Sequence, residues 1–252
     1  MSIPKKIHYC WFGGAEKPES VSKCIASWKK YMPDYEVIEW NENNIDFSEN
    51  QFAREAYEMK KWAFVSDYVR LLVLVNKGGI YFDTDVEVLK NFDDLLGYEA
   101  LAGFEEEKYV MTAVMAAQPN HPLLKQWLKH YEDLSFVLNG NQLNTTTNVH
   151  YFSEILKKNG LNPNGMRQNI AGIEIFPCEY FSPKNYYTER IQLTMNTYAI
   201  HHFQRSWCEV EPPLKRFLRM HPRIQYLYYL PNRIGKKILG NQYDNLKRRL
   251  KR

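Results

Sequence analysis

The chain has few cysteines and no long apolar run. Its 252 residues include four cysteines, which are scattered, form no Cys-x-x-Cys pair and lack the spacing of a metal site. This usage argues against a disulfide-stapled fold and predicts free thiols in a reducing compartment. The longest uninterrupted aliphatic run, 71–75, has five residues and is too short to span a bilayer.

The first residues, MSIPKKIHYCWFGG, lack the apolar stretch of a signal peptide, so we expect a cytoplasmic protein. The length suits one domain, or one domain with a tail. An apolar content of 44% and a charged content of 25% are ordinary for a globular protein. Aromatic residues are plentiful at 15%. This content suits a site that stacks on bases or sugar rings, but an AT-biased genome would give the same composition.

Acidic residues are almost missing from the end of the chain. Residues 212–252 hold 12 of the 33 Lys and Arg residues, but only one of the 29 Asp and Glu residues. Apolar residues recur there at helical spacing. We therefore divide the chain into a main domain, 1–211, and a basic amphipathic helical tail, 212–252. The tail suits peripheral contact with the anionic inner face of a cell membrane, and a solvated or RNA-binding terminus is the alternative.

Strand-like and helix-like segments alternate along the main domain. Predicted strands lie at 6–12, 35–40, 80–82, 86–89, 100–104, 110–117 and 173–176, and predicted helices lie at 18–31, 52–60, 62–77, 122–134 and 149–158. This alternation predicts an α/β fold in which helices cover the faces of a sheet. Ligands of such sheets bind at the carboxyl ends of the strands.

The most informative stretch is WAFVSDYVRLLVLVNKGGIYFDTD, residues 62–85. It predicts a helix that is apolar over most of its surface, and is therefore buried, yet carries Asp67 and Arg70 on one face. Two glycines, 78–79, end the helix because glycine adopts positive φ without steric cost. A short apolar strand, 80–82, follows.

Asp83 and Asp85 end this strand and, being two residues apart, are expected to point to the same side. Two buried carboxylates raise each other's pKa, and a divalent cation removes that cost. The Asp-x-Asp pair offers oxygen ligands to Mn²⁺ or Mg²⁺ and leaves positions open for phosphate oxygens. A solvated acidic turn is the alternative, but the apolar strand and the charged helix before it favour a metal site.

This stretch resembles a known family. The pattern A-x-x-S-D-x-x-R, followed by G-G-x-Y-x-D-x-D, resembles the DXD-containing glycosyltransferases of family 32, of the capsular and surface polysaccharide type. It is also similar to the glucosyltransferase domains of large clostridial toxins. The matching residues are Ala63, Ser66, Asp67, Arg70, Gly78, Gly79, Tyr81, Asp83 and Asp85. The resemblance implies a GT-A fold, with a Rossmann-like mixed sheet flanked by helices, and a metal-dependent retaining enzyme with a nucleotide-sugar donor.

The resemblance also implies a catalytic role for four charged residues. Asp85 is expected to bind the metal directly, while Asp83 contacts the ribose or reaches the metal through water. Asp67 and Arg70 are expected to grip the hydroxyl groups of the donor sugar. A surface ion pair is the alternative for these two residues, but it is a weak one because their helix is predicted to be buried.

The opening strand, IPKKIHYCWFGG, also matches the family. It implies that Trp11 stacks on the nucleotide base and that Gly13 lets the backbone approach the nucleotide. A core tryptophan at a strand end is the alternative for Trp11. A departure from the family occurs at 144–148, where many members carry a Gly-Pro pair and this chain has none, so no sugar contact is assigned there.

The late segment YAIHHFQRSW resembles the closing HH-x-x-x-S-W pattern of the family. It implies that His201 or His202 completes the metal shell. At most one of them is a ligand, because consecutive residues of a strand point to opposite faces. Trp207, with Ser206 beside it, is expected to contact the diphosphate. An acidic turn, 105–107, is expected to be solvated or to contact an acceptor hydroxyl.

The implied reaction moves a hexosyl group from a nucleotide sugar, a UDP-sugar, to a saccharide acceptor. We expect a lipid-linked acceptor and a role in surface polysaccharide synthesis. Two alternatives are a noncatalytic nucleotide-sugar-binding protein and a metal-dependent phosphohydrolase. The second would need more carboxylates for a two-metal site, and the sequence shows no second cluster. Specific binding of nucleic acid is not expected.

Overall fold

The computed structural model describes residues 2–204 and Met220. The chain divides into two compact units, of which the first comprises Met1–Lys184 with Ile191–Trp207. The second comprises Asn185–Arg190 with Cys208–Arg252. In its described part, the side chain of Asn185 caps a turn by accepting from the backbone N–H of Thr188, at 2.8 Å. The predicted tail, 212–252, lies outside the described residues apart from Met220.

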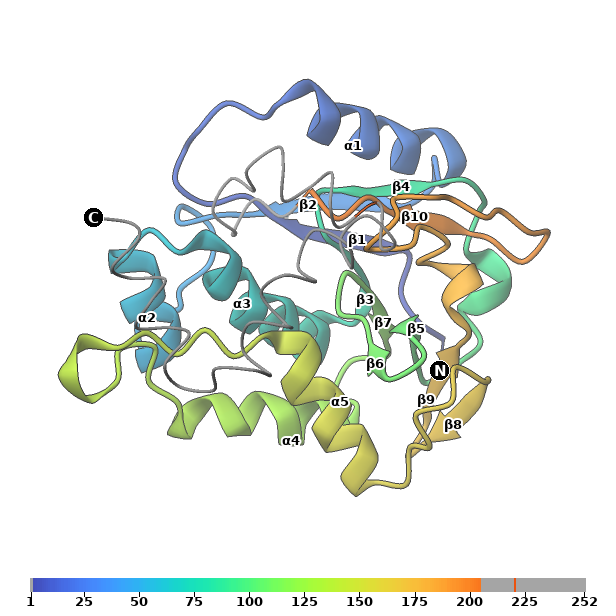
Figure 1. Ribbon diagram of the computed structural model, residues 1–252. Coiled ribbons are helices and arrows are strands. Elements are labelled where there is room, and N and C mark those ends of the chain that lie inside the picture. The colour runs from blue at the N-terminus through green and yellow to red at the C-terminus, as the bar shows by residue number, and fades with distance from the viewer. Residues whose placement is uncertain (1, 205–219, 221–252) are drawn as a thin grey trace, which may run out of the picture. The chain divides into compact units, whose positions relative to one another are not determined.

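The first unit is built on a mixed sheet with the strand order β2-β1-β3-β7-β5-β9-β8, and β6 pairs with β5 (Figure 1). The strands are β1 (Lys6–Cys10), β2 (Glu36–Trp40), β3 (Gly79–Phe82), β5 (Ala100–Glu106), β6 (Tyr109–Val110), β7 (Val114–Ala117), β8 (Gln168–Ile170) and β9 (Ile173–Phe176). β1 runs parallel to both β2 and β3, whereas β7 runs antiparallel to both β3 and β5. The predicted mixed α/β architecture is confirmed.

Helices cover both faces of this sheet (Figure 1). The α-helices of the first unit are α1 (Glu19–Tyr31), α2 (Gln51–Glu58), α3 (Trp62–Lys77), α4 (Pro122–His130) and α5 (Asn148–Lys158). α1 packs on one face together with a separate antiparallel pair, β4 (Val86–Val88) and β10 (Ala199–His201). The other helices form the second apolar layer. Each helix predicted within residues 2–204 is present, although α4 ends four residues earlier than expected and continues as a 3₁₀ turn.

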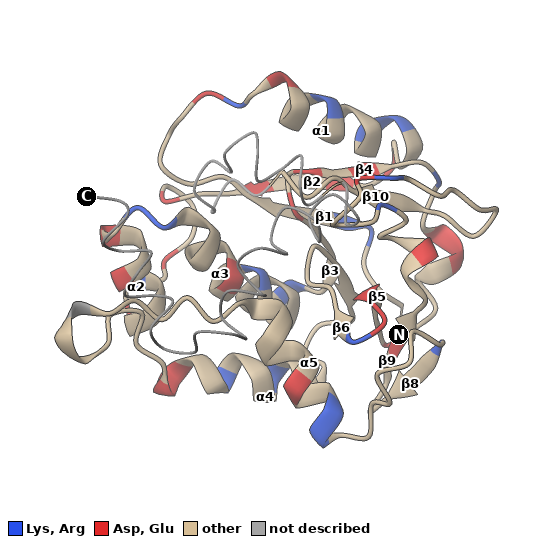
Figure 2. Ribbon diagram, in the orientation of Figure 1, with Lys and Arg blue, Asp and Glu red and all other residues tan. Residues whose placement is uncertain are grey.

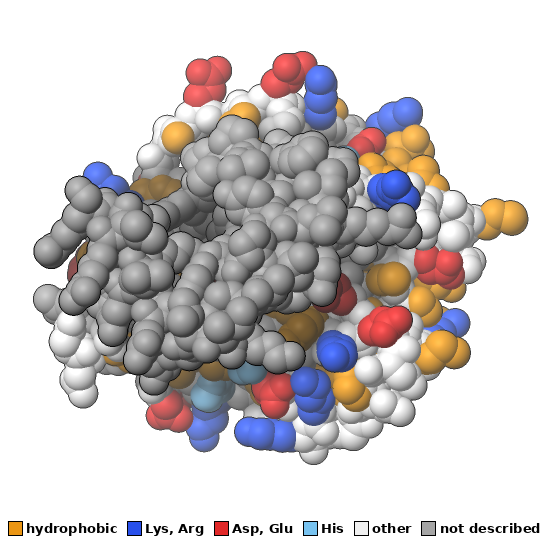
Figure 3. All heavy atoms as spheres, in the orientation of Figure 1, with side chains coloured by type: hydrophobic (Ala, Val, Ile, Leu, Met, Phe, Trp, Pro, Cys, Tyr) orange, Lys and Arg blue, Asp and Glu red, His pale blue; other side chains and the backbone are white. Residues whose placement is uncertain are grey.

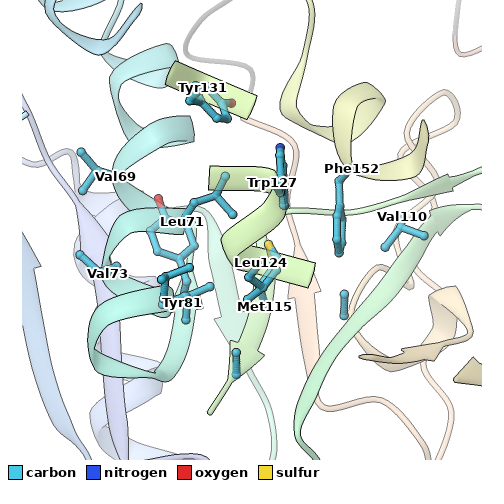
Figure 4. Packing of buried hydrophobic residues seen from close by; sticks show 14 of the residues in the cluster. Val69, Leu71, Val73, Tyr81, Val110, Met115, Leu124, Trp127, Tyr131 and Phe152 are labelled. Carbon is cyan, nitrogen blue, oxygen red and sulfur yellow. The ribbon is translucent and has the colours of Figure 1, made fainter. Parts of the chain in front are cut away.

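The larger apolar layer explains why α3 is buried. Val69, Leu71 and Val73 of α3 are almost fully buried, and Figure 4 shows Val69 and Val73 on one side of the helix and Leu71 on the other. Between α4 and α5, the rings of Trp127 and Phe152 stack with centroids 4.5 Å apart and planes 5° apart. The predicted burial of the charged helix is therefore confirmed, and its few polar side chains must find partners inside the protein.

Two glycines make the sharp junction between α3 and β3. Gly78 caps α3 with a φ of +62°, and Gly79 has a φ of +106°. A Cβ atom on Gly79 would lie 2.7 Å from the carbonyl oxygen of Lys6 and 2.9 Å from Nε2 of His8. Only glycine therefore lets β3 begin directly against β1.

One strand prediction needs correction, and one strand was not predicted. The strand predicted at 110–117 is divided into β6 and β7, because the intervening backbone bonds elsewhere: the N–H of Met111 donates to Gly103 and the carbonyl of Thr112 accepts from Arg70. The strand predicted at 86–89 is present as β4, which lies outside the main sheet and pairs with β10. β8 was not predicted, since its three residues show no alternation of apolar side chains.

Charged side chains of both signs are interspersed over the described part of the surface (Figures 2 and 3). Of the four cysteines, Cys10, Cys24 and Cys178 have free thiols, as predicted, and Cys208 lies outside the described residues. No helix among the described residues combines the length and the apolar character that crossing a membrane requires.

Candidate active site

The two aspartates of the DXD sequence, Asp83 and Asp85, lie in the turn that directly follows β3. The N–H of Asp83 still donates to Ala113, at 2.9 Å, and its carbonyl accepts from the N–H of Val86, at 3.0 Å, which closes the turn. The side chains of Asp83 and Asp85 are 29% and 14% exposed. This turn therefore presents two partly buried carboxylates at the carboxyl end of a central strand.

His201 joins these aspartates from β10. One ligand atom from each of Asp83, Asp85 and His201 lies within 4.8 Å of the other two. Nε2 of His201 lies 3.5 Å from Oδ1 of Asp85, and its buried Nδ1 has no hydrogen-bond partner among the described residues. Two carboxylates and an imidazole suit a divalent cation such as Mn²⁺, so the donor set fits the metal that the sequence predicts.

His202, which directly follows β10, takes a different direction from His201. Its Nε2 lies 2.9 Å from Oε2 of Glu87, outside the Asp-Asp-His group. The backbone of this segment nevertheless holds Asp85. The N–H of His202 donates to the carbonyl oxygen of Asp85 at 3.0 Å, and the N–H of Gln204 donates to its Oδ2 at 2.8 Å. Of the two histidines, His201 is the one placed to bind a metal.

Arg70 ties α3 to the DXD turn. Its Nη2 lies 2.9 Å from Oδ1 of Asp67 and 3.1 Å from Oδ1 of Asp83, and its Nη1 donates to the carbonyl of Thr112 at 2.6 Å. Nε donates to Ser66, at 3.4 Å. The side chain is 5% exposed, and these contacts leave about one of its five N–H groups for a ligand. The main role of Arg70 in the site is therefore to hold the side chains of Asp67 and Asp83 in place.

Asp67 is held in an environment that disfavours its charge. Burial raises the pKa of its carboxyl to about 7, against the ordinary 3.8, although Arg70 opposes the shift. The charge of Asp83 adds to the rise, while a hydrogen bond from Asn148 opposes it. Burial also raises the pKa of Asp83 itself, and the neighbouring Asp85 contributes to this shift. A cation or a hydrogen-bonding ligand in the site would lower the cost of ionising these groups.

Asn148 and Thr112 were not assigned a role from the sequence. Asn148 is the first residue of α5 and is 3% exposed. Its Nδ2 donates to the backbone carbonyl of Asp67, at 3.3 Å, while its Oδ1 accepts from the hydroxyl of Tyr131. The only sequence signal was the predicted helix start, which is confirmed with Thr147 as the N-cap.

Trp11 and the DXD turn share one edge of the sheet. Trp11 directly follows β1, Asp83 directly follows β3, and these neighbouring strands are parallel. The indole Nε1 of Trp11 donates to the carbonyl of Ala15 at 2.6 Å, and the ring is partly exposed. A Cβ atom on Gly13 would lie 2.6 Å from the indole of Trp62, so packing inside the protein already requires this glycine. The predicted contacts of both residues with a nucleotide stay predictions.

The other predicted donor-contacting residues, Ser206 and Trp207, lie outside the described residues. Their predicted contact with the diphosphate therefore stays a prediction, based on the resemblance of the segment that contains them.

Comparison with known proteins relates this chain to glycosyltransferases. Residues 18–102, which include the DXD sequence, match the family model described as the glycosyltransferase sugar-binding region containing the DXD motif. An uncharacterized glycosyltransferase of Acanthamoeba polyphaga mimivirus is 28% identical over 197 residues, which cover 73% of this chain and 76% of that protein. The inositol phosphoceramide mannosyltransferase 3 of Schizosaccharomyces pombe is 28% identical over 143 residues, covering 54% of this chain and 39% of that protein.

Among solved structures, the PaToxG glycosyltransferase superposes with a TM-score of 0.48 at 20% identity, covering 62% of this chain and 70% of that one. Of the two relatives compared by sequence, the chain spans about three quarters of the mimivirus glycosyltransferase but less than half of the mannosyltransferase of the yeast Schizosaccharomyces pombe. The family-model match and the named relatives support an enzyme of the glycosyltransferase class.

Proposed function

We propose that this protein transfers a hexosyl group from a nucleoside diphosphate sugar to a saccharide hydroxyl, with retention of the anomeric configuration, as a GT-A enzyme of family 32. The observation that carries the proposal is the convergence of Asp83, Asp85 and His201 at one sheet edge, beside the buried Arg70. A UDP-sugar is our first choice of donor. A GDP-sugar is the second, because two relatives bear the name mannosyltransferase.

Asp85 and His201, with Asp83, would hold Mn²⁺ or Mg²⁺. Such an ion neutralises the charge of a departing diphosphate. Asp85 is the better direct ligand, because Asp83 also shares its carboxylate with Arg70. The ion pairs of Arg70 with Asp67 and Asp83 orient both carboxylates. Asp67 then offers acceptor oxygens to donor-sugar hydroxyls, and Trp11 offers its ring to the base.

Two bonds change at the sugar C1 in the proposed reaction. The bond between the sugar C1 and the diphosphate oxygen breaks, and a bond between C1 and the acceptor oxygen forms on the same face of the sugar. The proton of the acceptor hydroxyl moves to the departing diphosphate oxygen. Front-face attack of this kind needs no covalent nucleophile from the protein.

We further propose a lipid-linked acceptor in surface polysaccharide synthesis at the cytoplasmic face of a membrane. Two observations support it. Residues 212–252 are strongly basic, and the name of the yeast relative denotes transfer to a ceramide lipid. Anionic membranes attract such segments. Flotation with anionic vesicles should carry the full chain and not a chain ending at residue 211; equal flotation of the two would refute the membrane role of the tail.

The function is tested by a screen of UDP- and GDP-sugars for nucleotide release that depends on Mn²⁺. We expect release with at least one donor, and its loss in Asp85→Asn with the circular dichroism spectrum unchanged. Asp133→Asn, at an exposed aspartate after α4, is the matched control and should retain the parental rate. Binding of every donor without turnover would favour the noncatalytic alternative, and cleavage between the phosphates would favour the phosphohydrolase.

A further inference from the structure

A third carboxylate approaches the Asp-Asp-His group from a different strand. In the pairing of β5 with β6, Phe104 lies opposite Val110 and Glu106 lies opposite Tyr109. Two residues advance on β5 for one on β6, so Glu105 is the extra residue of a β-bulge. Bulges re-aim a side chain and are frequent beside active sites.

The direction of the strands brings this bulge to the same edge as the DXD turn. β3 and β5 both run antiparallel to β7, so their carboxyl ends lie at one edge of the sheet. The backbone that leads from β6 to β7 joins the two regions. Its Thr112 carbonyl accepts from Arg70, and its Ala113 carbonyl accepts from the N–H of Asp83. The acidic turn between β5 and β6 is visible in Figure 2.

Glu105 and Glu106 are partly buried, whereas Glu107 is exposed. Burial raises the pKa of the Glu105 carboxyl; His201 opposes the rise, and Glu106, Asp83 and Asp85 add to it. The direction of these effects agrees with the position of Glu105 at the same sheet edge as Asp83 and Asp85.

Glu105 is nevertheless separate from the Asp-Asp-His group. It is not among the described residues whose ligand atoms lie within 4.8 Å of one another. Asp83 and Asp85 are engaged by Arg70 and by the backbone of Gln204. Within residues 2–204, no hydrogen bond or ion pair engages the carboxylate of Glu105.

We propose that Glu105 contacts the acceptor: its carboxylate accepts a hydrogen bond from the saccharide hydroxyl that attacks the donor, and thereby orients the attacking oxygen. This inference rests on the proposed function. The carboxylate takes up no proton in this step, because the proton of the hydroxyl passes to the departing diphosphate oxygen. A hydroxyl held in one direction spends more of its time in the geometry that reacts, and a misplacement of about 1 Å can cost about 100-fold in rate.

The test compares Glu105→Gln with Glu107→Gln in the full chain. Three quantities are measured: the affinity for UDP with Mn²⁺, the rate of donor hydrolysis by water, and the rate of transfer to a panel of methyl glycosides. For Glu105→Gln we expect UDP affinity within about twofold of the parent and transfer at least about 100-fold slower, with hydrolysis reduced much less. Glu107→Gln should match the parent in all three.

Two results would overturn the inference while leaving the proposed function in place. One is transfer by Glu105→Gln within about threefold of the parental rate. The other is loss of UDP and Mn²⁺ binding in this variant, which would place Glu105 among the donor or metal contacts. If the parent releases no nucleotide from any sugar donor with Mn²⁺, the proposed function fails, and the role of Glu105 fails with it.

Discussion

Nη2 of Arg70 in α3 lies 3.1 Å from Oδ1 of Asp83 in the turn after β3. This contact links a buried helix to the turn that carries two candidate metal ligands. The guanidinium also lies over the ring of Tyr81, 4.7 Å from its centroid. Burial alone would lower the pKa of Arg70, but Asp83, Tyr81 and Asp67 raise it, so the side chain stays charged.

Replacing Arg70 should destabilise the fold as well as the site. Arg70→Ala leaves Asp67 and Asp83 without their cationic partner inside the protein. We expect the free energy of unfolding to fall by about 3–5 kcal/mol, as for other broken buried pairs. Urea denaturation measures this change. Arg54→Ala, at an exposed arginine of α2 that donates to Ser48, should cost less than about 1 kcal/mol; equal losses in the two variants would contradict the account.

The pKa of Asp67 predicts a pH dependence of stability. With the pKa at about 7 in the folded chain and near 3.8 in the unfolded chain, folded Asp67 holds a proton that the unfolded chain has released. The contribution of Asp67 to stability is thus complete below about pH 4 and is lost as the pH rises through about 7. In metal-free protein, the free energy of unfolding of the parent, relative to Asp67→Asn, should fall by up to about 1.4 kcal/mol per pH unit in this window. A difference that is independent of pH would show that the pKa of Asp67 is not raised.

Gly79 should tolerate no side chain. Its φ of +106° and the 2.7 Å approach of a Cβ atom to the carbonyl oxygen of Lys6 predict that Gly79→Ala loses at least about 2 kcal/mol of unfolding free energy. Gly97→Ala is the matched control, because a Cβ atom there has no neighbour within 4 Å, and it should change stability by less than about 1 kcal/mol. Thermal or urea unfolding measures both. An unaffected Gly79→Ala would show that β3 can shift away from β1.

The structure of α3, the glycine junction and β3 could be predicted from the sequence, because the signals for it are local. The apolar surface of α3 and the two glycines after it predicted a buried helix, a sharp junction and a short strand, and the structure confirms them. The spacing of Asp67 and Arg70 predicted their shared helix face, and they form an ion pair at 2.9 Å.

The remaining features depend on tertiary register, which no local pattern encodes. Thr112 contributes a backbone carbonyl to Arg70, and any residue type can do that. Asn148 lies just before the helix predicted at 149–158, and its hydrogen bond to the backbone of Asp67 depends on tertiary structure that brings the two segments together. The choice of His201 over His202 follows from the pairing of β10 with β4, which places His201 opposite Val86.

The most direct test of the central claim is a titration of Mn²⁺, followed by electron paramagnetic resonance in the presence of UDP. We compare the parent with His201→Ala and His202→Ala, because the imidazole of His201 lies beside Asp85 whereas that of its neighbour His202 contacts Glu87. The account predicts Mn²⁺ binding that weakens at least about 10-fold in His201→Ala and is unchanged in His202→Ala. Parental affinity in His201→Ala, or an equal loss in both variants, would contradict a metal site made by Asp83, Asp85 and His201.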